Sequence, residues 1–210
     1  MPSHFTEKSA VGSWAYRWIA GAFAIGVAGT AAAADSPVFT QTNFRVETVG
    51  GVPAFCSFDF TMLYKDFVTQ QGALAMITGS LLWFEKDSNI QAGLKLAGAD
   101  VPGDPTTAKH FSINQGFVAI KDKPIAPGKT TRGLDPKDIL AIYPSASADQ
   151  IFGGLFDNTL SIVFNREVGA LDEHLLIAVD FGAAEKSHDL QDFKDCIAAI
   201  VKQGNAHSTK

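Results

Sequence analysis

Hydrophobic and polar residues alternate along residues 54–67, AFCSFDFTMLYKDF. In an extended chain, one side of this segment carries Cys56, Phe58, Phe60, Met62 and Tyr64. The residues between them are mostly polar. Period-two alternation is typical of a strand that is buried on one face. The pattern therefore predicts a strand whose cysteine points into the core and whose other face meets water.

Similar patterns recur along the chain and predict a β-rich domain. Apolar, β-branched or alternating residues fill seven further segments, at 37–49, 73–84, 91–97, 116–121, 138–143, 159–166 and 174–181. Turn residues separate several of them, at Gly50–Gly51, Asp87–Asn89 and Gly153–Gly154. Short strands at this spacing favour an antiparallel β-sandwich or a barrel-like curved sheet. Gly79, inside the segment 73–84, predicts a bulge or a bend in that strand.

One helix is predicted at the C-terminal end of the chain, at about 189–203. Spacings of three and four residues place one apolar stripe on it, made of Leu190, Phe193, Ile197, Ile200 and Val201. Gly204 is expected to end the helix, and residues 204–210 to form a disordered tail. The predicted fold class is therefore β-rich α+β, with a sandwich or curved sheet packed by one C-terminal helix in a single domain at 35–203.

The first 34 residues have the pattern of a secretory signal peptide. A polar segment with Lys8 and Arg17 precedes the uncharged run WIAGAFAIGVAGTAAAA, which ends in an A-x-A sequence before Asp35. A membrane anchor is the alternative, but the strongly apolar part, 18–29, is shorter than the roughly 20 residues that span a bilayer. We expect cleavage after Ala34, a periplasmic or secreted location, and no transmembrane segment in the mature protein.

Cys56 and Cys196 are the only cysteines in the sequence. Disulfides form and persist in the oxidising compartments that exported proteins enter. A metal-binding pair or a catalytic thiol is the alternative, but neither cysteine has a C-x-x-C partner or an adjacent histidine. Both cysteines lie on or beside an apolar face, Cys56 on a strand and Cys196 on the helix. We therefore predict a structural disulfide between them.

Residues that could carry catalysis or bind a metal are sparse. Ser57 and Asp59 could join a histidine in a triad, but a solvated sheet face is the simpler interpretation, and no G-x-S-x-G motif occurs. His174 and His188 lie beside carboxylates without the spacing of a metal site. No phosphate-binding motif is present. We predict no catalytic residue, no metal and no cofactor, with a periplasmic hydrolase that uses an unrecognised site as the alternative function.

Charge is concentrated in the proline-rich segment 121–137. It holds five basic residues, Lys121, Lys123, Lys129, Arg132 and Lys137, in a chain whose formal net charge is −5. Overall acidity argues against nucleic-acid binding. The segment is either a solvated connection or a contact for an envelope protein, a lipid or an anionic polysaccharide. With an apolar patch beside it, it would suit an amphiphilic or anionic ligand. The predicted function is therefore an exported, non-catalytic envelope protein that binds such a ligand or partner.

Overall fold

The computed structural model describes residues 37–103, 107–168, 170–181 and 188–207, with side chains up to residue 202. All of these lie in one compact unit, Ala31–Lys210. The predicted signal peptide at 1–34 lies outside the described residues. Within the described part of the chain, neither helix is long and apolar enough to cross a membrane.

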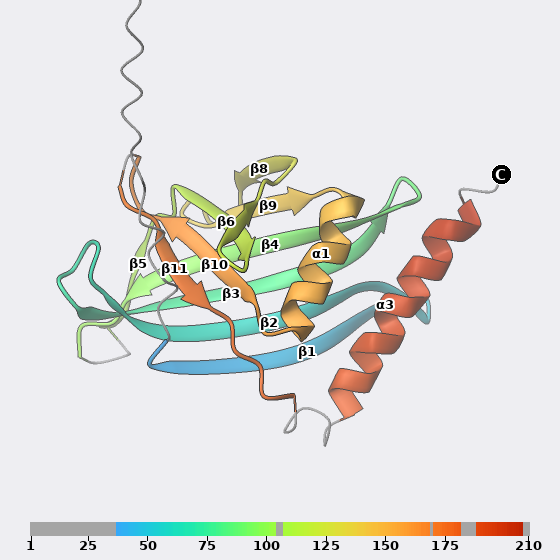
Figure 1. The fold of residues 1–210 in the computed structure, drawn as a ribbon, viewed down its shortest axis with the longest axis horizontal. Coiled ribbons are helices and arrows are strands. Elements are labelled where there is room, and N and C mark those ends of the chain that lie inside the picture. The colour runs from blue at the N-terminus through green and yellow to red at the C-terminus, as the bar shows by residue number, and fades with distance from the viewer. Residues whose placement is uncertain (1–36, 104–106, 169, 182–187, 208–210) are drawn as a thin grey trace, which may run out of the picture. The chain divides into compact units, whose positions relative to one another are not determined.

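The larger of two antiparallel sheets has seven strands (Figure 1). Its order is β1 (Phe39–Val49), β2 (Val52–Asp66), β3 (Ala73–Lys86), β4 (Asn89–Asp100), β9 (Ile139–Tyr143) and β8 (Lys129–Arg132), and β5 (Lys109–Phe111) also pairs with β4. The turn between β1 and β2 needs positive φ angles, which Gly50 and Gly51 adopt at 62° and 81°. The sheet is open at β1 and β8, so it does not close on itself.

The smaller sheet has four antiparallel strands and packs on the larger one. Its order is β11 (Glu173–Leu176), β10 (Leu160–Asn165), β6 (Gln115–Ile120) and β7 (Lys123–Ile125). The main-chain N–H of Val118 on β6 donates to the Tyr143 hydroxyl on β9 at 2.9 Å, which ties the two sheets together. The rings of Tyr64 and Phe164 also meet between them, with centroids 5.9 Å apart. The predicted β-sandwich is confirmed.

The inner face of β2 is the apolar side of its alternating pattern. Its five side chains are buried, each exposed by 2% or less, and are Cys56, Phe58, Phe60, Met62 and Tyr64. The opposite side, which we call the outer face of the larger sheet, carries Asp59 and Thr61, both of which are partly exposed. The period-two pattern therefore oriented this strand correctly, although Ser57, which we expected on the solvated face, is buried at 0% exposure.

The predicted C-terminal helix is α3 (His188–His207), which packs on β1, β2 and β3. Phe193 makes two aromatic contacts with the sheet. The centroid of its ring lies 5.0 Å from that of Phe44 and 5.6 Å from that of Trp83. The helix continues to His207 and includes Gly204, where we expected it to end. An interior glycine costs a helix only about 1 kcal/mol, so it permits an end there without forcing one.

A second helix, α1 (Ser145–Phe156), was not predicted, so the fold has two described helices instead of one. The pair Gly153–Gly154, which we interpreted as a turn, lies inside it. Gly154 is buried against Ile120, because a Cβ at this position would lie 2.8 Å from that side chain. The indole N–H of Trp83 donates to the carbonyl of Ala148 at 3.3 Å and joins α1 to β3. Tertiary packing therefore outweighs the helix-breaking tendency of the two glycines.

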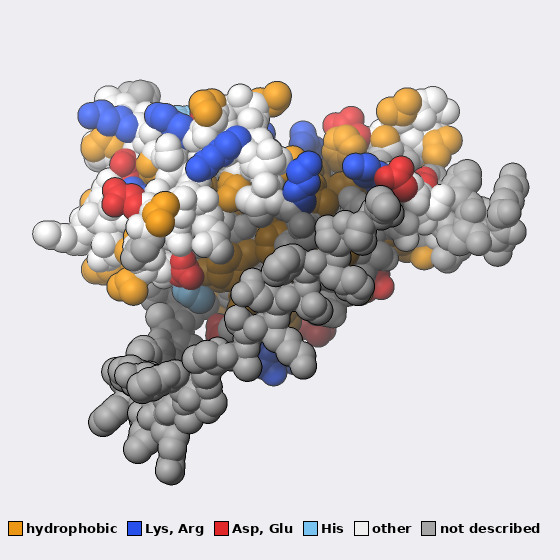
Figure 2. Space-filling model, turned by 90° about the horizontal axis from the view of Figure 1, so that it is seen from above, with side chains coloured by type: hydrophobic (Ala, Val, Ile, Leu, Met, Phe, Trp, Pro, Cys, Tyr) orange, Lys and Arg blue, Asp and Glu red, His pale blue; other side chains and the backbone are white. Residues whose placement is uncertain are grey.

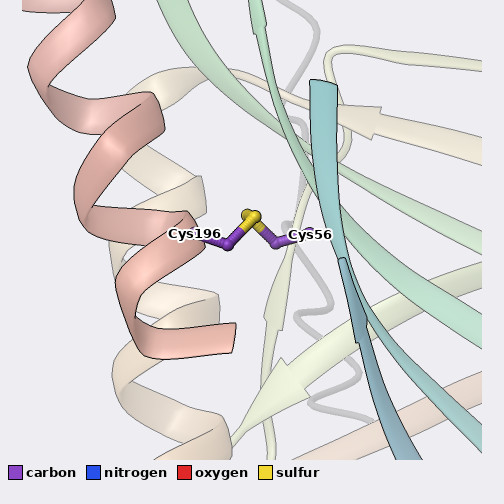
Figure 3. The surroundings of a disulfide bond; sticks show 2 residues. All are labelled: Cys56 and Cys196. Atoms are coloured by element: carbon purple, nitrogen blue, oxygen red, sulfur yellow. A yellow bond between two sulfur atoms is a disulfide. The ribbon is translucent and has the colours of Figure 1, made fainter. Parts of the chain in front are cut away.

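A disulfide joins Cys56 on β2 to Cys196 on α3 (Figure 3). Their Cα atoms are 6.0 Å apart although the residues are separated by 140 positions in the sequence. The predicted disulfide is confirmed, and it fixes the last helix to the second strand. Both cysteines are buried, Cys56 at 0% and Cys196 at 2% exposure, which agrees with their placement on facing apolar surfaces.

Gly79 does not create the bulge that the sequence suggested. β2 and β3 pair without a shift in register from Phe55–Phe84 to Asp66–Ala73, with Phe60 opposite Gly79. A Cβ at Gly79 would collide with the ring of Phe60 and would lie 2.6 Å from the main-chain oxygen of Lys95. The glycine is therefore required by close packing, which is the other use of glycine within a strand.

Candidate functional site

The basic segment 121–137 is divided between the two sheets. Lys121 and Lys123 lie at the β6–β7 hairpin of the smaller sheet, whereas Lys129 and Arg132 lie on β8 at the edge of the larger sheet. Figure 2 shows that the Lys and Arg side chains on the face seen from above are separated by uncharged surface. The segment therefore does not form one continuous basic patch.

Two of the five basic side chains donate hydrogen bonds to main-chain carbonyl oxygens. Arg132 Nη1 donates to the carbonyl oxygen of Ile113. Lys137 Nζ donates to the carbonyl oxygen of His110 at 2.9 Å. Both acceptors belong to the β5–β6 region, so these residues fasten the β8–β9 region to it. Lys121, Lys123 and Lys129 are exposed and lie beside pockets instead.

The first of these pockets, which we call the hairpin pocket, lies between the β6–β7 hairpin and α1 and has a volume of ≈ 410 Å³. Its lining consists of Ile120, Lys121, Lys123, Pro124, Ile125, Gln150, Gly153, Gly154, Asp157 and Thr159. Gly153 leaves open space at its Cβ position. Lys121 and Lys123 supply positive charge, but Asp157 places a carboxylate in the same lining.

The second pocket, which we call the outer pocket, lies on the outer face of the larger sheet and has a volume of ≈ 400 Å³. Its lining consists of Phe84, Lys86, Gln91, Gly128, Lys129, Thr131, Leu140, Ile142 and Pro144. These residues come from β3, β4, β8 and β9 and from the segments that flank β8 and β9. Alternation along β3 places Phe84 and Lys86 on the same side of the sheet, so an apolar ring and an ammonium group meet there.

The outer pocket has an apolar floor and two lysines, and its lining residues include no carboxylate. Phe84, Leu140 and Ile142 are partly buried, while Lys129 is exposed. Gly93, opposite Ile142 in the β4–β9 pairing, has no side chain that would raise the sheet surface beside it. Such an arrangement can hold an apolar chain on the sheet and an anionic group between Lys86 and Lys129.

Two further pockets fit an anion less well, because one is lined by carboxylates and the other includes a carboxylate that is in an ion pair. One of ≈ 370 Å³ lies beside the disulfide and includes Asp192 and Asp195. The other, of ≈ 220 Å³, lies on the outer face around Asp59 and Lys95. Asp59 there pairs with Arg45 Nε at 2.6 Å and accepts a hydrogen bond from Ser80 Oγ at 2.6 Å. The carboxylate that we considered for a triad thus has two structural partners.

A buried ionic cluster at the other end of β2 was not predicted. Arg166 lies just after β10 with its side chain 6% exposed, and its Nη2 is 2.7 Å from Asp66 Oδ2. Its Nη1 is 2.7 Å from Asp100 Oδ1, and its Nε is 3.7 Å from Glu173 Oε1. Nη2 also donates to the Tyr64 hydroxyl at 3.1 Å. The cluster joins β2 and β4 of the larger sheet to β10 and β11 of the smaller one.

The cluster is arranged to keep Arg166 charged and Tyr64 neutral. Burial would lower the pKa of Arg166, but the hydrogen bond with Tyr64 and the carboxylates of Asp100 and Asp66 raise it above its ordinary value. Burial, followed by the charge of Glu173, raises the pKa of Tyr64 well above its ordinary value of 10.0. The guanidinium also lies over the ring of Phe111, with Cζ 3.5 Å from the ring centroid. These contacts are those of a structural tie between the sheets.

The two histidines that we considered for catalysis lie on different elements. His174 is on β11 and His188 is the first residue of α3. Asp172 Oδ1 accepts a hydrogen bond from Asn165 Nδ2 at 2.8 Å. Within the described ranges, no group of three or more His, Cys, Asp or Glu residues is placed to hold a metal ion.

Sequence reasoning singled out Lys129 but missed Lys86 and Arg166. Lys86 lies at the end of a strand and is separated from Lys129 by the whole of β4 to β7, so only the strand order brings the two into one pocket. Arg166 was visible as a charge at the end of an apolar strand, which is a weak signal. Comparison with protein-family models, with curated proteins and with solved structures gives no match to this chain.

Proposed function

We propose that this protein is an exported binding protein for amphiphilic anions and that the outer pocket holds the ligand. The observation that carries the proposal is the lining of that pocket, in which Lys86 and Lys129 accompany Phe84, Leu140 and Ile142 and no carboxylate is included. The ligand would lay a short apolar chain against the sheet and place its anionic group between the two ammonium groups. The protein binds this ligand and does not transform it.

The size and position of the pocket set limits on the ligand. A volume of ≈ 400 Å³ on an open sheet face suits a single short chain with one head group. Lys86 and Lys129 lie at a surface, where charge pairs contribute roughly 0.2–1 kcal/mol each. Binding should therefore be modest in affinity and should weaken as salt is added, because exposed charges are screened.

Two observations support the export part of the proposal. The first 34 residues have the charge, apolar run and A-x-A sequence of a signal peptide. The disulfide between Cys56 and Cys196 is compatible with an oxidising compartment. We accordingly propose a periplasmic or secreted location, where envelope lipids and other amphiphiles are available as ligands.

Isothermal titration of the mature protein, residues 35–210, with octyl phosphate tests the proposal, with octyl glucoside as the uncharged comparison. We expect octyl phosphate to bind and the glucoside to bind at least about fivefold more weakly, because it lacks the charge that the lysines recognise. The variant Lys86→Gln/Lys129→Gln should lose about tenfold in affinity for the phosphate. Added salt should weaken binding to the parent and change binding to this variant little.

The hairpin pocket provides the matched control. Lys121→Gln/Lys123→Gln removes the same amount of charge from the chain but leaves the outer pocket intact, so its affinity should equal that of the parent. Equal losses in both double variants would indicate a general charge effect and would contradict the proposal. No binding of octyl phosphate to the parent would also contradict it.

A further inference from the structure

Most of the exposed apolar side chains lie at one end of the sandwich. Among the described residues, ten large hydrophobic side chains are exposed, and seven of these belong to segments at that end. We call this set the apolar loop end, and it consists of Val38, Phe39, Phe67, Val68, Leu134, Val168 and Leu171. These side chains do not form one continuous patch, but their concentration at one end favours an end that meets something other than water.

Three segments of this end are joined directly. Phe67 and Val68 follow Asp66, which pairs with Arg166, and Val168 lies two residues after that arginine in the β10–β11 connection. The start of β1 lies alongside, because the N–H of Val38 donates to the carbonyl of Leu63 at 2.7 Å. Figure 1 shows the β2–β3 turn, the β10–β11 connection and the start of β1 at the same end of the sheets.

The β8–β9 turn, which carries Leu134, is fastened to the same end through the β5–β6 connection. The N–H of Ile113 donates to the carbonyl of Lys137 at 3.0 Å, and the N–H of Asn114 donates to the carbonyl of Asn165 at 2.9 Å. The buried ionic cluster around Arg166 lies beneath these segments. The exposed apolar side chains therefore lie on segments that main-chain hydrogen bonds and ion pairs hold in place.

The apolar side chains stand out as separate tips. Leu134 is 101% exposed, Val168 88%, Leu171 76% and Phe67 68%. None of them lines any of the four pockets described above. A protein partner requires a continuous surface that packs closely. A lipid bilayer accepts separate apolar side chains, because each can enter the acyl region by itself while the polar main chain stays among the head groups.

The charges around the tips indicate which kind of bilayer fits. Among the described residues of the β2–β3, β8–β9 and β10–β11 connections, the four carboxylates outnumber the two cations, with Asp135, Asp138, Glu167 and Asp172 against Lys137 and Arg166. Attraction to an anionic lipid surface needs an excess of positive charge. These connections have no such excess, so they fit head groups without net charge.

We propose that the apolar loop end is a membrane-contacting surface that inserts its tips into a bilayer of zwitterionic lipids. This surface is distinct from the outer pocket, since Phe67 and Val68 precede the first residue of β3 whereas Phe84 and Lys86 are near its last. The inference does not depend on the proposed function. Membrane contact here would leave the outer pocket, at the far end of β3, open to ligand.

Flotation of the mature protein, residues 35–210, with phosphatidylcholine vesicles tests the inference. Each large apolar side chain removed from the membrane should reduce partitioning by about tenfold. We expect Phe67→Ser/Leu171→Ser to reduce vesicle binding about a hundredfold. Because the interaction is apolar, high salt should leave binding of the parent unchanged, and replacing a third of the lipid with phosphatidylglycerol should not increase it.

Val49→Ser/Val52→Ser is the matched control, because these two valines are 74% and 50% exposed in the β1–β2 turn, away from the apolar loop end. This variant should bind vesicles as the parent does. The inference is overturned if the parent does not bind phosphatidylcholine, if it binds only vesicles that contain phosphatidylglycerol, or if the control loses as much as the test variant. Sedimentation that shows a dimer of the parent, abolished by Phe67→Ser/Leu171→Ser, would overturn it in favour of contact between two copies.

Discussion

Arg166 Nη2 lies 2.7 Å from Asp66 Oδ2, and the two side chains are 6% and 0% exposed. The residues are one hundred positions apart in the sequence; Asp66 is the last residue of β2 in the larger sheet, and Arg166 directly follows β10 of the smaller one. Two charges taken out of water in this way are stable only together, because each would otherwise remain buried without a counter-charge. This pair therefore holds the two sheets together. The β2–β3 turn and the β10–β11 connection of the apolar loop end begin at these two residues.

Arg166→Met should destabilise the protein by about 3–5 kcal/mol, since it leaves Asp66 and Glu173 buried without the guanidinium. Urea unfolding followed by circular dichroism measures the change. Arg45→Met is the matched control, because its pair with Asp59 is partly exposed, at 52% and 24%. Loss of an exposed pair should cost less than about 1 kcal/mol. Equal costs for the two variants would contradict the structural role that we assign to the cluster.

The disulfide should contribute a large part of the stability. The chain-entropy model gives on the order of 5 kcal/mol for a bridge between residues 140 positions apart. We expect Cys56→Ala/Cys196→Ala to lower the free energy of unfolding by about 2–5 kcal/mol. Parent protein measured with a strong reductant should behave like the double variant, while the reductant should not affect the variant. Free thiols in the unreduced, denatured parent would show that the bridge is absent.

Local patterns in the sequence predicted the elements whose burial is regular. β2 alternates over its whole length, so its inner and outer faces could be assigned before its partners were known. α3 likewise has an apolar stripe at helical spacing, and the two faces together were enough to predict the disulfide between Cys56 and Cys196. In these elements the pattern of burial follows from the geometry of one strand or one helix.

Elements that depend on their neighbours could not be predicted in this way. α1 contains Gly153 and Gly154 and has no residue that caps its start with a side chain, so it forms because Ile151 and Leu155 are buried by the sheets. The same limit applies to the sites. Lys86 and Lys129 enter one pocket only through the strand order, and Arg166 meets Asp100 across 66 positions. No pattern in the sequence around these residues predicts the contacts between them.

Two strand glycines should respond oppositely to alanine. A Cβ at Gly79 would lie 2.6 Å from the main-chain oxygen of Lys95, which cannot move aside, so Gly79→Ala should destabilise by about 1–3 kcal/mol. A Cβ at Gly93 would lie 3.6 Å from Ile142 and Phe84, an ordinary contact. Gly93→Ala should therefore stabilise by up to about 1 kcal/mol. Thermal unfolding of both variants checks the two signs, and destabilisation of both by a similar amount would refute the packing account.

Processing of the N-terminus is a direct test of the proposed export. Expressed with its full sequence in a bacterium that exports proteins, the chain should be recovered from the periplasm or the medium with Asp35 as its first residue. The reason is the A-x-A sequence that ends the apolar run. Intact-mass measurement gives the answer, and Ala34→Asp should block or shift the cleavage. A mature protein that retains residues 18–29 would instead be anchored by them.

Alkaline pH should destabilise the protein through two buried tyrosines. Burial, followed by the charge of Glu173, raises the pKa of Tyr64 well above its ordinary value of 10.0. Burial likewise raises the pKa of Tyr143, although the hydrogen bond from the Val118 N–H opposes the change. The folded protein thus keeps both protons at a pH where the unfolded chain releases them. The stability that this difference provides is fully present below the unfolded pKa and is lost as the pH rises above it.

Between pH 10 and 12, the free energy of unfolding should therefore fall by up to about 1.4 kcal/mol per pH unit for each tyrosine. Urea unfolding at successive pH values measures the slope, and tyrosinate absorbance should appear only as the protein unfolds. Tyr143→Phe should remove about half of the slope, because phenylalanine has no proton to release, while Tyr64 continues to contribute the rest. A slope that is the same in this variant as in the parent would mean that the Tyr143 hydroxyl titrates alike in the folded and unfolded chains.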